Sequence, residues 1–148
     1  MQFTWSRFEQ LGVDNLHDAL QLRSRVFILE QGPYLDVDGL DRRAWHLLGR
    51  DGEGVLVAYL RVVDPGLKYD EPSIGRVVTA PEVRGTGRGR SLMREGLDGC
   101  RRHWPDSGIR ISAQARLQRF YAELGFSAVG AEYLEDDIPH IEMLWRPI

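Results

Sequence analysis

A glycine-rich turn between an apolar segment and a helical pattern constrains this chain more than any other feature. The turn reads Arg84-Gly85-Thr86-Gly87-Arg88-Gly89. It follows the strand-like run SIGRVVT at 73–79 and precedes a segment, 89–103, whose apolar residues recur at helical spacing. A glycine-rich turn that opens a helix points unpaired backbone N–H groups and the positive end of the helix at one spot. The sequence therefore predicts a binding site for phosphate or pyrophosphate at this turn.

Arginine is concentrated around the turn. Of the 19 basic residues 18 are arginine, and six of these lie within nineteen positions: Arg84, Arg88, Arg90, Arg94, Arg101 and Arg102. Because the formal net charge of the chain is −3, the cluster indicates a local anion site rather than a generally basic surface. The alternative is a surface turn whose glycines serve only positive φ angles and whose arginines are solvated. The flanking strand and amphipathic helix favour the anion site.

Other common sites do not fit the residues. A Rossmann fingerprint needs a third glycine three residues after the second, and position 90 is arginine. A P-loop ends in Gly-Lys-Ser/Thr, whereas the one lysine of the chain is Lys68. There is no Gly-x-Ser-x-Gly segment for a serine hydrolase. With one cysteine and no His-x-x-x-His pair, we expect no metal site.

The apolar patterns along the chain predict a mixed α/β fold of class α+β, with helices flanking a mixed central β-sheet. We expect one domain, 1–148, with the element order β-α-β-β-β-α-β-α-β-β. The expected strands are 2–8, 46–50, 55–63, 73–79, 109–113, 126–134 and 138–145, and the expected helices are 14–29, 89–103 and 117–124.

Composition limits the setting in which such a domain would work. A chain of 148 residues can bury one sizeable core, and no apolar run is long enough to span a membrane. The N-terminal MQFTWSRFEQ lacks the regions of a signal peptide, and the lone Cys100 excludes an internal disulfide framework. We expect a cytoplasmic protein. The slightly acidic balance argues against a nucleic-acid partner, and we expect exposed tryptophans, which together with edge strands would suit a homodimer.

The turn resembles the acetyl-CoA signature of the GCN5-related N-acetyltransferase (GNAT) superfamily, Arg/Gln-x-x-Gly-x-Gly/Ala, through Arg84, Gly87 and Gly89. A second segment, Gln114 to Tyr121-x-x-x-Gly-Phe, is similar to the family's Asn…Tyr-x-x-x-Gly-Phe, with Gln114 in place of the asparagine. Within the superfamily the chain resembles the ElaA-like group. That likeness rests on LRSRVF at 22–27, Glu30-Gln31, DGLD at 38–41, GRVV at 75–78, AQA at 113–115 and YLEDDIPH at 133–140.

The resemblance implies roles for particular residues. Strand residues Val77, Val78 and Thr79 would pair with the pantetheine arm, and the Val78 N–H would polarise the thioester carbonyl. Tyr121 would protonate the leaving thiolate, although its place on an apolar helix stripe also suits simple core packing. Gln114 would contact the pantetheine. The residues of the turn that would hold the pyrophosphate are Arg84, Gly85, Thr86, Gly87, Arg88, Gly89 and Arg90.

The acceptor side is less defined. An amine must lose a proton before it attacks, so a general base is needed. The segment Asp136-Asp137-Ile138-Pro139-His140 is the most unusual candidate, and we take His140 from it as a catalytic residue, while a tight polar turn would explain the same residues. The other candidates are Glu30, Asp36, Asp38 and His46.

These observations lead to one functional expectation and one alternative. We expect an acetyl-CoA-dependent N-acyltransferase in which an amine acceptor attacks the bound thioester directly, with acetyl-CoA as cosubstrate and no metal. The alternative is a non-catalytic CoA-binding, sensing or interaction module on the same fold.

Overall fold

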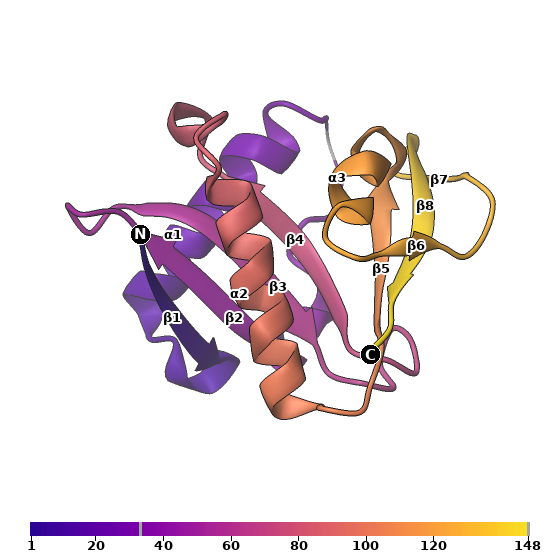
Figure 1. Cartoon of the computed structure of the whole chain (residues 1–148). Helices are drawn as coiled ribbons and strands as arrows, with labels where there is room; N and C mark the ends of the chain where they lie inside the picture. Colours follow the sequence, from indigo (N-terminus) through magenta and orange to yellow (C-terminus); the bar gives the residue numbers. More distant parts are fainter. Residues whose placement is uncertain (33, 148) are drawn as a thin grey trace.

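The computed structural model describes residues 1–32 and 34–147, and its strands form two antiparallel sheets (Figure 1). The first sheet has the order β1-β2-β3-β4. In the second sheet β5, β8 and β6 lie side by side, and β7 also pairs with β8. The strands are β1 (Gln2–Arg7), β2 (Ala44–Arg50), β3 (Leu56–Val63), β4 (Ser73–Thr79), β5 (Ile109–Gln114), β6 (Ser127–Ala128), β7 (Tyr133–Glu135) and β8 (Ile138–Trp145).

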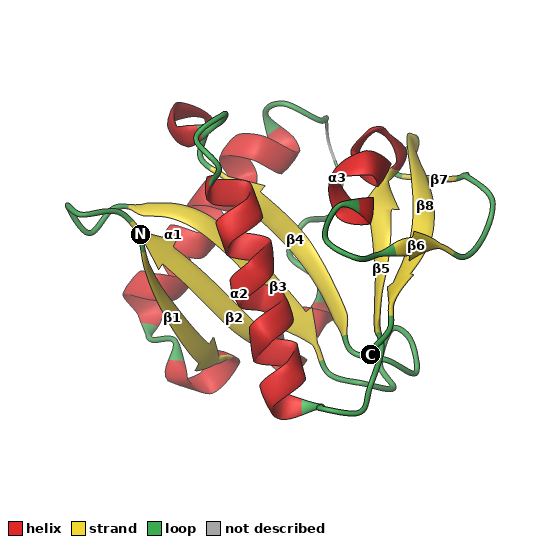
Figure 2. Cartoon of the chain, viewed as in Figure 1, coloured by secondary structure: helices red, strands yellow, loops and turns green. Residues whose placement is uncertain are grey.

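Helices cover both faces of the first sheet (Figure 2). On β3, Leu60 and Val62 face the core beneath α2, whereas Tyr59 faces the core beneath α1. All eight residues of β3 are buried, as expected of a strand with both faces covered. The helices are α1 (Val13–Arg23), extended by a π-helical turn (Ser24–Ile28), α2 (Arg88–His103) and α3 (Gln118–Ala122). Short 3₁₀ turns lie at Phe8–Gln10, Gly39–Arg43, Pro81–Val83 and Ala115–Leu117.

The two sheets meet at β4 and β5, which run in the same direction and separate toward their C-terminal ends (Figure 1). They are joined where they begin: the Arg110 N–H donates to the Pro72 carbonyl at 3.1 Å, and the Arg110 side chain binds Glu71 at 3.0 Å. Beyond this junction no ladder joins them within the described ranges, so one edge of β4 stays open.

A β-bulge lies in the middle of β4. Tyr59 pairs with Val78 and Arg61 pairs with Gly75, so two residues of β4 lie opposite Leu60 alone. Arg76, in the bulge, has φ 49°, a conformation that non-glycine residues seldom adopt. A bulge of this kind redirects side chains locally, and here it occurs beside the open edge.

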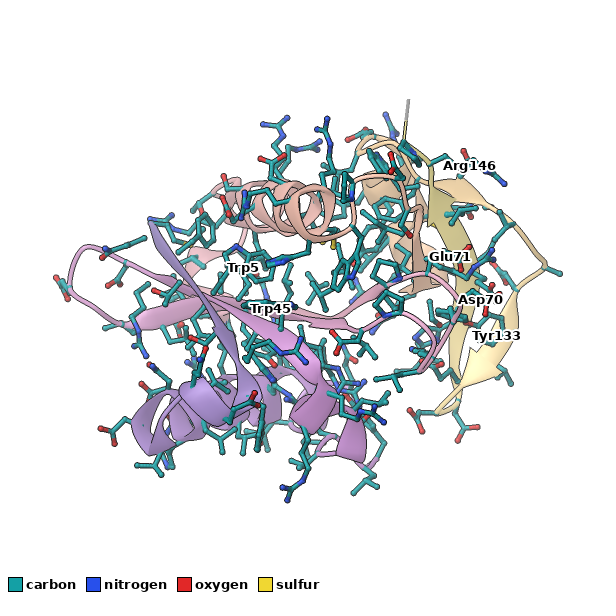
Figure 3. All side chains as sticks on the ribbon, turned by 90° about the horizontal axis from the view of Figure 1, so that it is seen from below. Trp5, Trp45, Asp70, Glu71, Tyr133 and Arg146 are labelled. Atoms are coloured by element: carbon teal, nitrogen blue, oxygen red, sulfur yellow. The ribbon has the colours of Figure 1, made fainter. Side chains whose placement is uncertain are left out.

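The fold class and the order of the first eight elements are confirmed, but the expected single mixed sheet is two antiparallel sheets in the described residues, and three further details differ. The strand expected at 126–134 is two short strands, β6 and β7. The first helix changes from α to π geometry after Arg23. The tryptophans expected on the surface pack against the core: the Trp5 ring lies so close to α2 that a Cβ on Gly99 would come within 2.3 Å of it (Figure 3). No helix in the described ranges combines the length and hydropathy needed to cross a membrane.

Candidate functional site

A cleft of about 890 Å³, counting the part open to solvent, lies where β4 and β5 separate. The bulged part of β4 forms one wall and β5 forms the other. The segment after α1 contributes Gln31 and Tyr34, and the β7–β8 hairpin contributes Glu135 and Asp136. These four parts of the chain, far apart in the sequence, therefore surround one space between the sheets.

The open edge of β4 presents backbone groups to this cleft. The Ala80 N–H donates to the Val57 carbonyl of the neighbouring chain segment at 2.8 Å, and Val78 pairs with Tyr59 of β3. Since backbone groups alternate sides along a strand, the Val78 N–H also points toward β3. The N–H groups of Val77 and Thr79 point to the open edge. The register thus corrects the sequence-based choice of Val78, whose N–H lies on the paired side.

The glycine-rich turn follows this strand and opens α2. Gly85 and Gly87 have φ 77° and 81°, and Gly87 is the residue that caps the helix. No side chain caps α2, and its first backbone bond is the Ser91 N–H to the Gly87 carbonyl at 3.1 Å. The N–H groups before Ser91 therefore have no partner in the helix. A Cβ on either glycine would meet no atom within 4 Å, so the space over the turn is open.

The arginines of the turn differ in their partners. Arg84 pairs with Glu30 at 2.7 Å, and Arg90 pairs with Glu123 at 2.8 Å. Arg88 binds only the Thr86 hydroxyl, at 3.0 Å, and forms no ion pair with any residue that the structure describes. Of Arg84, Arg88 and Arg90, Arg88 is therefore the one whose charge no carboxylate of the described residues neutralises.

Tyr121 and Gln114 both line the cleft. Tyr121, on α3, is 7% exposed and packs edge-on against Phe120 and Phe126, with ring centroids 5.1 and 6.0 Å away. Burial raises the pKa of its phenol to about 12. Its hydroxyl has no hydrogen-bond partner in the described part of the chain. Gln114 ends β5, and its amide donates to the Gln31 Oε1 at 3.1 Å.

His140 is buried on β8 and also lines the cleft. Its Nδ1 lies 2.7 Å from the Ile138 carbonyl, which can only accept, so Nδ1 carries a proton in this bond. Its Nε2 lies 3.5 Å from Glu135 Oε2. Asp136 and Asp137, with φ 51° and 62°, form the two-residue turn of the β7–β8 hairpin, so the tight-turn interpretation accounts for those two carboxylates.

The other candidate bases are engaged elsewhere. Asp36 binds Arg23 at 3.0 Å and Arg76 at 2.9 Å. Burial alone would raise the pKa of Asp38, but hydrogen bonds from Arg61 outweigh it and leave that pKa lowered. Glu30 pairs with Arg84 outside the cleft.

His46 is occupied at both ring nitrogens. Its Nε2 lies 2.8 Å from the Asp41 carbonyl and its Nδ1 lies 2.7 Å from the Tyr59 hydroxyl, while burial lowers its pKa. Taken with the ion pairs of Asp36 and Asp38, these contacts leave His140, which lines the cleft, as the expected base.

A buried charge network, which the sequence analysis missed, holds one wall of the cleft. Arg23 is 1% exposed and binds Asp41 at 2.9 Å as well as Asp36. Arg61 binds Asp41 at 2.8 Å and also binds Asp38. The polar segment around 34–41 is therefore anchored over β3 and β4. The signal available in the sequence was arginine at an apolar helix position. Among the described residues, no His, Cys, Asp and Glu side chains gather in a group able to hold a metal.

Comparisons with known proteins agree on one family. The model of the acetyltransferase (GNAT) domain matches residues 41–147. A UPF0039 protein of Synechocystis is 44% identical over 147 residues, which cover 99% of this chain and 96% of the relative. Protein ElaA of Escherichia coli is 42% identical over 137 residues, covering 90% and 89% of the two chains. The crystal structure of an acyl-CoA N-acyltransferase from Pseudomonas aeruginosa has a TM-score of 0.92 and 44% identity, covering 97% of this chain and 98% of that one.

Proposed function

Because this chain belongs to the GNAT acetyltransferase family and to its ElaA-like group, we propose that it transfers an acetyl group from acetyl-CoA to an amine acceptor. The observation that carries the proposal is the continuity of the open β4 edge with the uncapped, glycine-rich start of α2. An extended pantetheine arm suits the first feature, and a pyrophosphate suits the second.

In this proposal the donor lies along β4. The free N–H groups of Val77 and Thr79 bind amide and thioester oxygens, one of them polarising the thioester carbonyl as an oxyanion hole would. The backbone N–H groups from Gly85 to Arg90 hold the pyrophosphate, whereas the Arg84 N–H donates to the Pro81 carbonyl; Arg88 adds the side-chain contact because its charge is not neutralised. Gln114 contacts the arm from the opposite wall.

The chemistry then needs only two proton transfers. The acceptor amine attacks the thioester carbonyl directly, an amide bond forms, and the C–S bond breaks. His140 Nε2 takes the proton that the amine loses. Tyr121 gives its proton to the departing thiolate, and its raised pKa keeps the phenol protonated until then.

Calorimetric titration with acetyl-CoA tests this function first. We expect saturable binding with a micromolar Kd for acetyl-CoA and for desulfo-CoA, and no binding of NAD. Absence of binding at millimolar acetyl-CoA would contradict the proposal. Where binding is found, a screen of primary amines read by release of free thiol identifies an acceptor.

We further propose that residues 1–148 act as one domain in the cytoplasm. Cys100 is buried in the core, and burial raises its pKa to about 12, so the thiol is protonated and packs as a small apolar group. A single buried thiol suits a reducing compartment.

Replacing Gly87 with valine should weaken acetyl-CoA binding by roughly tenfold or more, the loss of one or two charge-assisted hydrogen bonds. The Cβ would occupy the open space over the turn, and φ 81° is strained for valine. Gly54→Val is the matched control, because Gly54 also has φ 81° and open space but lies in the β2–β3 turn. Calorimetry should show normal affinity for the control. Equal affinities for the two variants would remove the turn from the site.

Replacing His140 with glutamine should lower kcat/KM for an amine acceptor by roughly 10²-fold, the usual size of a general-base contribution. The acetyl-CoA Kd should be unchanged, because the side chain acts on the acceptor. His103→Gln is the control: this histidine lies at the end of α2, where it stacks on Trp45 at 4.3 Å. Thiol-release rates across several amine concentrations provide the measurement. A full rate in His140→Gln would assign the base to another group.

A further inference from the structure

The one lysine of the chain, Lys68, lines the same cleft as Tyr121 and His140. It belongs to the loop between β3 and β4, which turns back on itself through a bond from the Gly66 N–H to the Tyr69 carbonyl at 2.7 Å. Asp70 and Glu71 of this loop lie beside Tyr133 of β7 (Figure 3), and Glu71 is held there by Arg110 of β5. The loop therefore places Lys68 in the wall of the cleft, close to where the two sheets are joined.

Lys68 differs chemically from the other cations of the cleft. Arg61 and Arg76 are paired with carboxylates of the buried network, and a guanidinium stays protonated and is a poor nucleophile. Lys68 forms no ion pair with any carboxylate in the ranges 1–32 and 34–147, and its Nζ lies 5.6 Å from the Tyr69 ring centre. Lys68 is exposed to solvent, so its amine is open to a reagent that enters the cleft. Because the chain has no other lysine, Lys68 is the one side chain on which this reaction can form an amide.

We propose that Lys68 is a self-acetylation site of this protein. The inference rests on the proposed use of acetyl-CoA, because the amine and the thioester would share one continuous space. Neutral Nζ attacks the thioester carbonyl, an amide forms on Lys68, and the C–S bond breaks. The amine loses one proton to His140 or to water, and the thiolate gains one from Tyr121, so CoA leaves as the free thiol. Because the nucleophile is part of the enzyme, it is held near the thioester, and this proximity accelerates the attack.

Mass spectrometry of the intact chain after incubation with acetyl-CoA at neutral pH tests the proposal. We expect a gain of one acetyl group, mapped by peptide analysis to Lys68. The α-amino group of Met1 is an internal reference, because it lies at the start of β1, in the strand of the first sheet farthest from the cleft (Figure 1). An α-amino group has an ordinary pKa of roughly 8, so uncatalysed acetylation favours Met1 over a lysine. Modification of Lys68 should exceed that of Met1 by at least about tenfold.

Two variants and one unfolding condition test whether the fold directs acetylation to Lys68. Lys68→Arg keeps the positive charge and should gain no acetyl group at position 68 or elsewhere in excess of Met1. The Tyr121→Phe variant should acetylate Lys68 more slowly. Protein unfolded in urea should lose the preference for Lys68. If calorimetry shows acetyl-CoA binding while Lys68 stays unmodified, or reacts no faster than Met1, the self-acetylation proposal is wrong and the proposed function stands. If acetyl-CoA does not bind, both fail.

Discussion

Replacing Tyr121 with phenylalanine is expected to lower kcat by roughly 10²-fold while leaving the Kd for acetyl-CoA nearly unchanged. The substitution removes only a hydroxyl that has no hydrogen-bond partner among the described residues, so packing against Phe120 and Phe126 is kept. What is lost is the proton donor for the leaving thiolate. Thiol release at saturating acceptor gives kcat, and calorimetry gives the Kd.

Tyr59→Phe is the matched control for this result. Tyr59 is also buried and burial also raises its pKa, but it lies beneath α1 and bonds to His46 away from the cleft. The control should lose some stability and keep its kcat. If Tyr121→Phe keeps a full kcat, Tyr121 is a packing residue and the thiolate takes its proton from another source.

Replacing Arg23 with alanine is expected to lower the free energy of unfolding by about 3–5 kcal/mol, the usual cost of breaking a buried ion pair. The guanidinium is 1% exposed and binds the carboxylates of Asp36 and Asp41 and the Asp36 carbonyl. Without this guanidinium, the buried carboxylates of Asp36 and Asp41 would each lose an ion-pair partner. Urea unfolding followed by circular dichroism measures the change.

An exposed arginine provides the comparison. Arg119 is 93% exposed and pairs with Glu123 at 3.5 Å one helical turn away, so Arg119→Ala should change stability by less than about 0.5 kcal/mol. If both alanine variants unfold at the same urea concentration, the buried network does not anchor the wall of the cleft. Arg23→Met, which keeps the volume without the charge, separates lost packing from lost pairing.

The glycine-rich turn and the strand and helix that flank it could be predicted from the sequence because their signals are local. Glycine spacing, a preceding apolar run and a following helical stripe all lie within about thirty residues, and each depends on backbone properties of the residues themselves. The turn, α2 and β4 were therefore predicted at nearly their observed bounds. The same is true of the β7–β8 turn, whose Asp136 and Asp137 tolerate positive φ.

The state of the other candidate residues could not be predicted from the sequence, because it depends on partners that lie far away in the chain. Asp36, Asp38 and His46 look like free bases in the sequence, and only the packing of α1 on β3 shows that Arg23, Arg61 and Tyr59 occupy them. Charge pairing across a fold leaves no periodic signal.

The choice between Val77 and Val78 failed for a related reason. Residues 77 and 78 are identical, and which N–H faces the open edge is set by the pairing of β4 with β3 and by the bulge at Arg76. Hydrophobic alternation identifies which side chains share a face, but two neighbouring valines that pack on opposite faces, Val78 buried and Val77 half-buried, give no alternation to detect.

In the anchored segment after α1, residues that tolerate substitution alternate with residues that do not. Asp36 and Asp38 bind arginines of the network, whereas Leu35 and Val37, which alternate with them along the chain, are exposed. A substitution of Asp36 or Asp38 would destabilise the protein, and selection removes such variants whatever else the substitution changes. Mutational drift at positions 35 and 37 carries no such penalty. Positions 35 and 37 are therefore expected to tolerate substitution, whereas positions 36 and 38 are not.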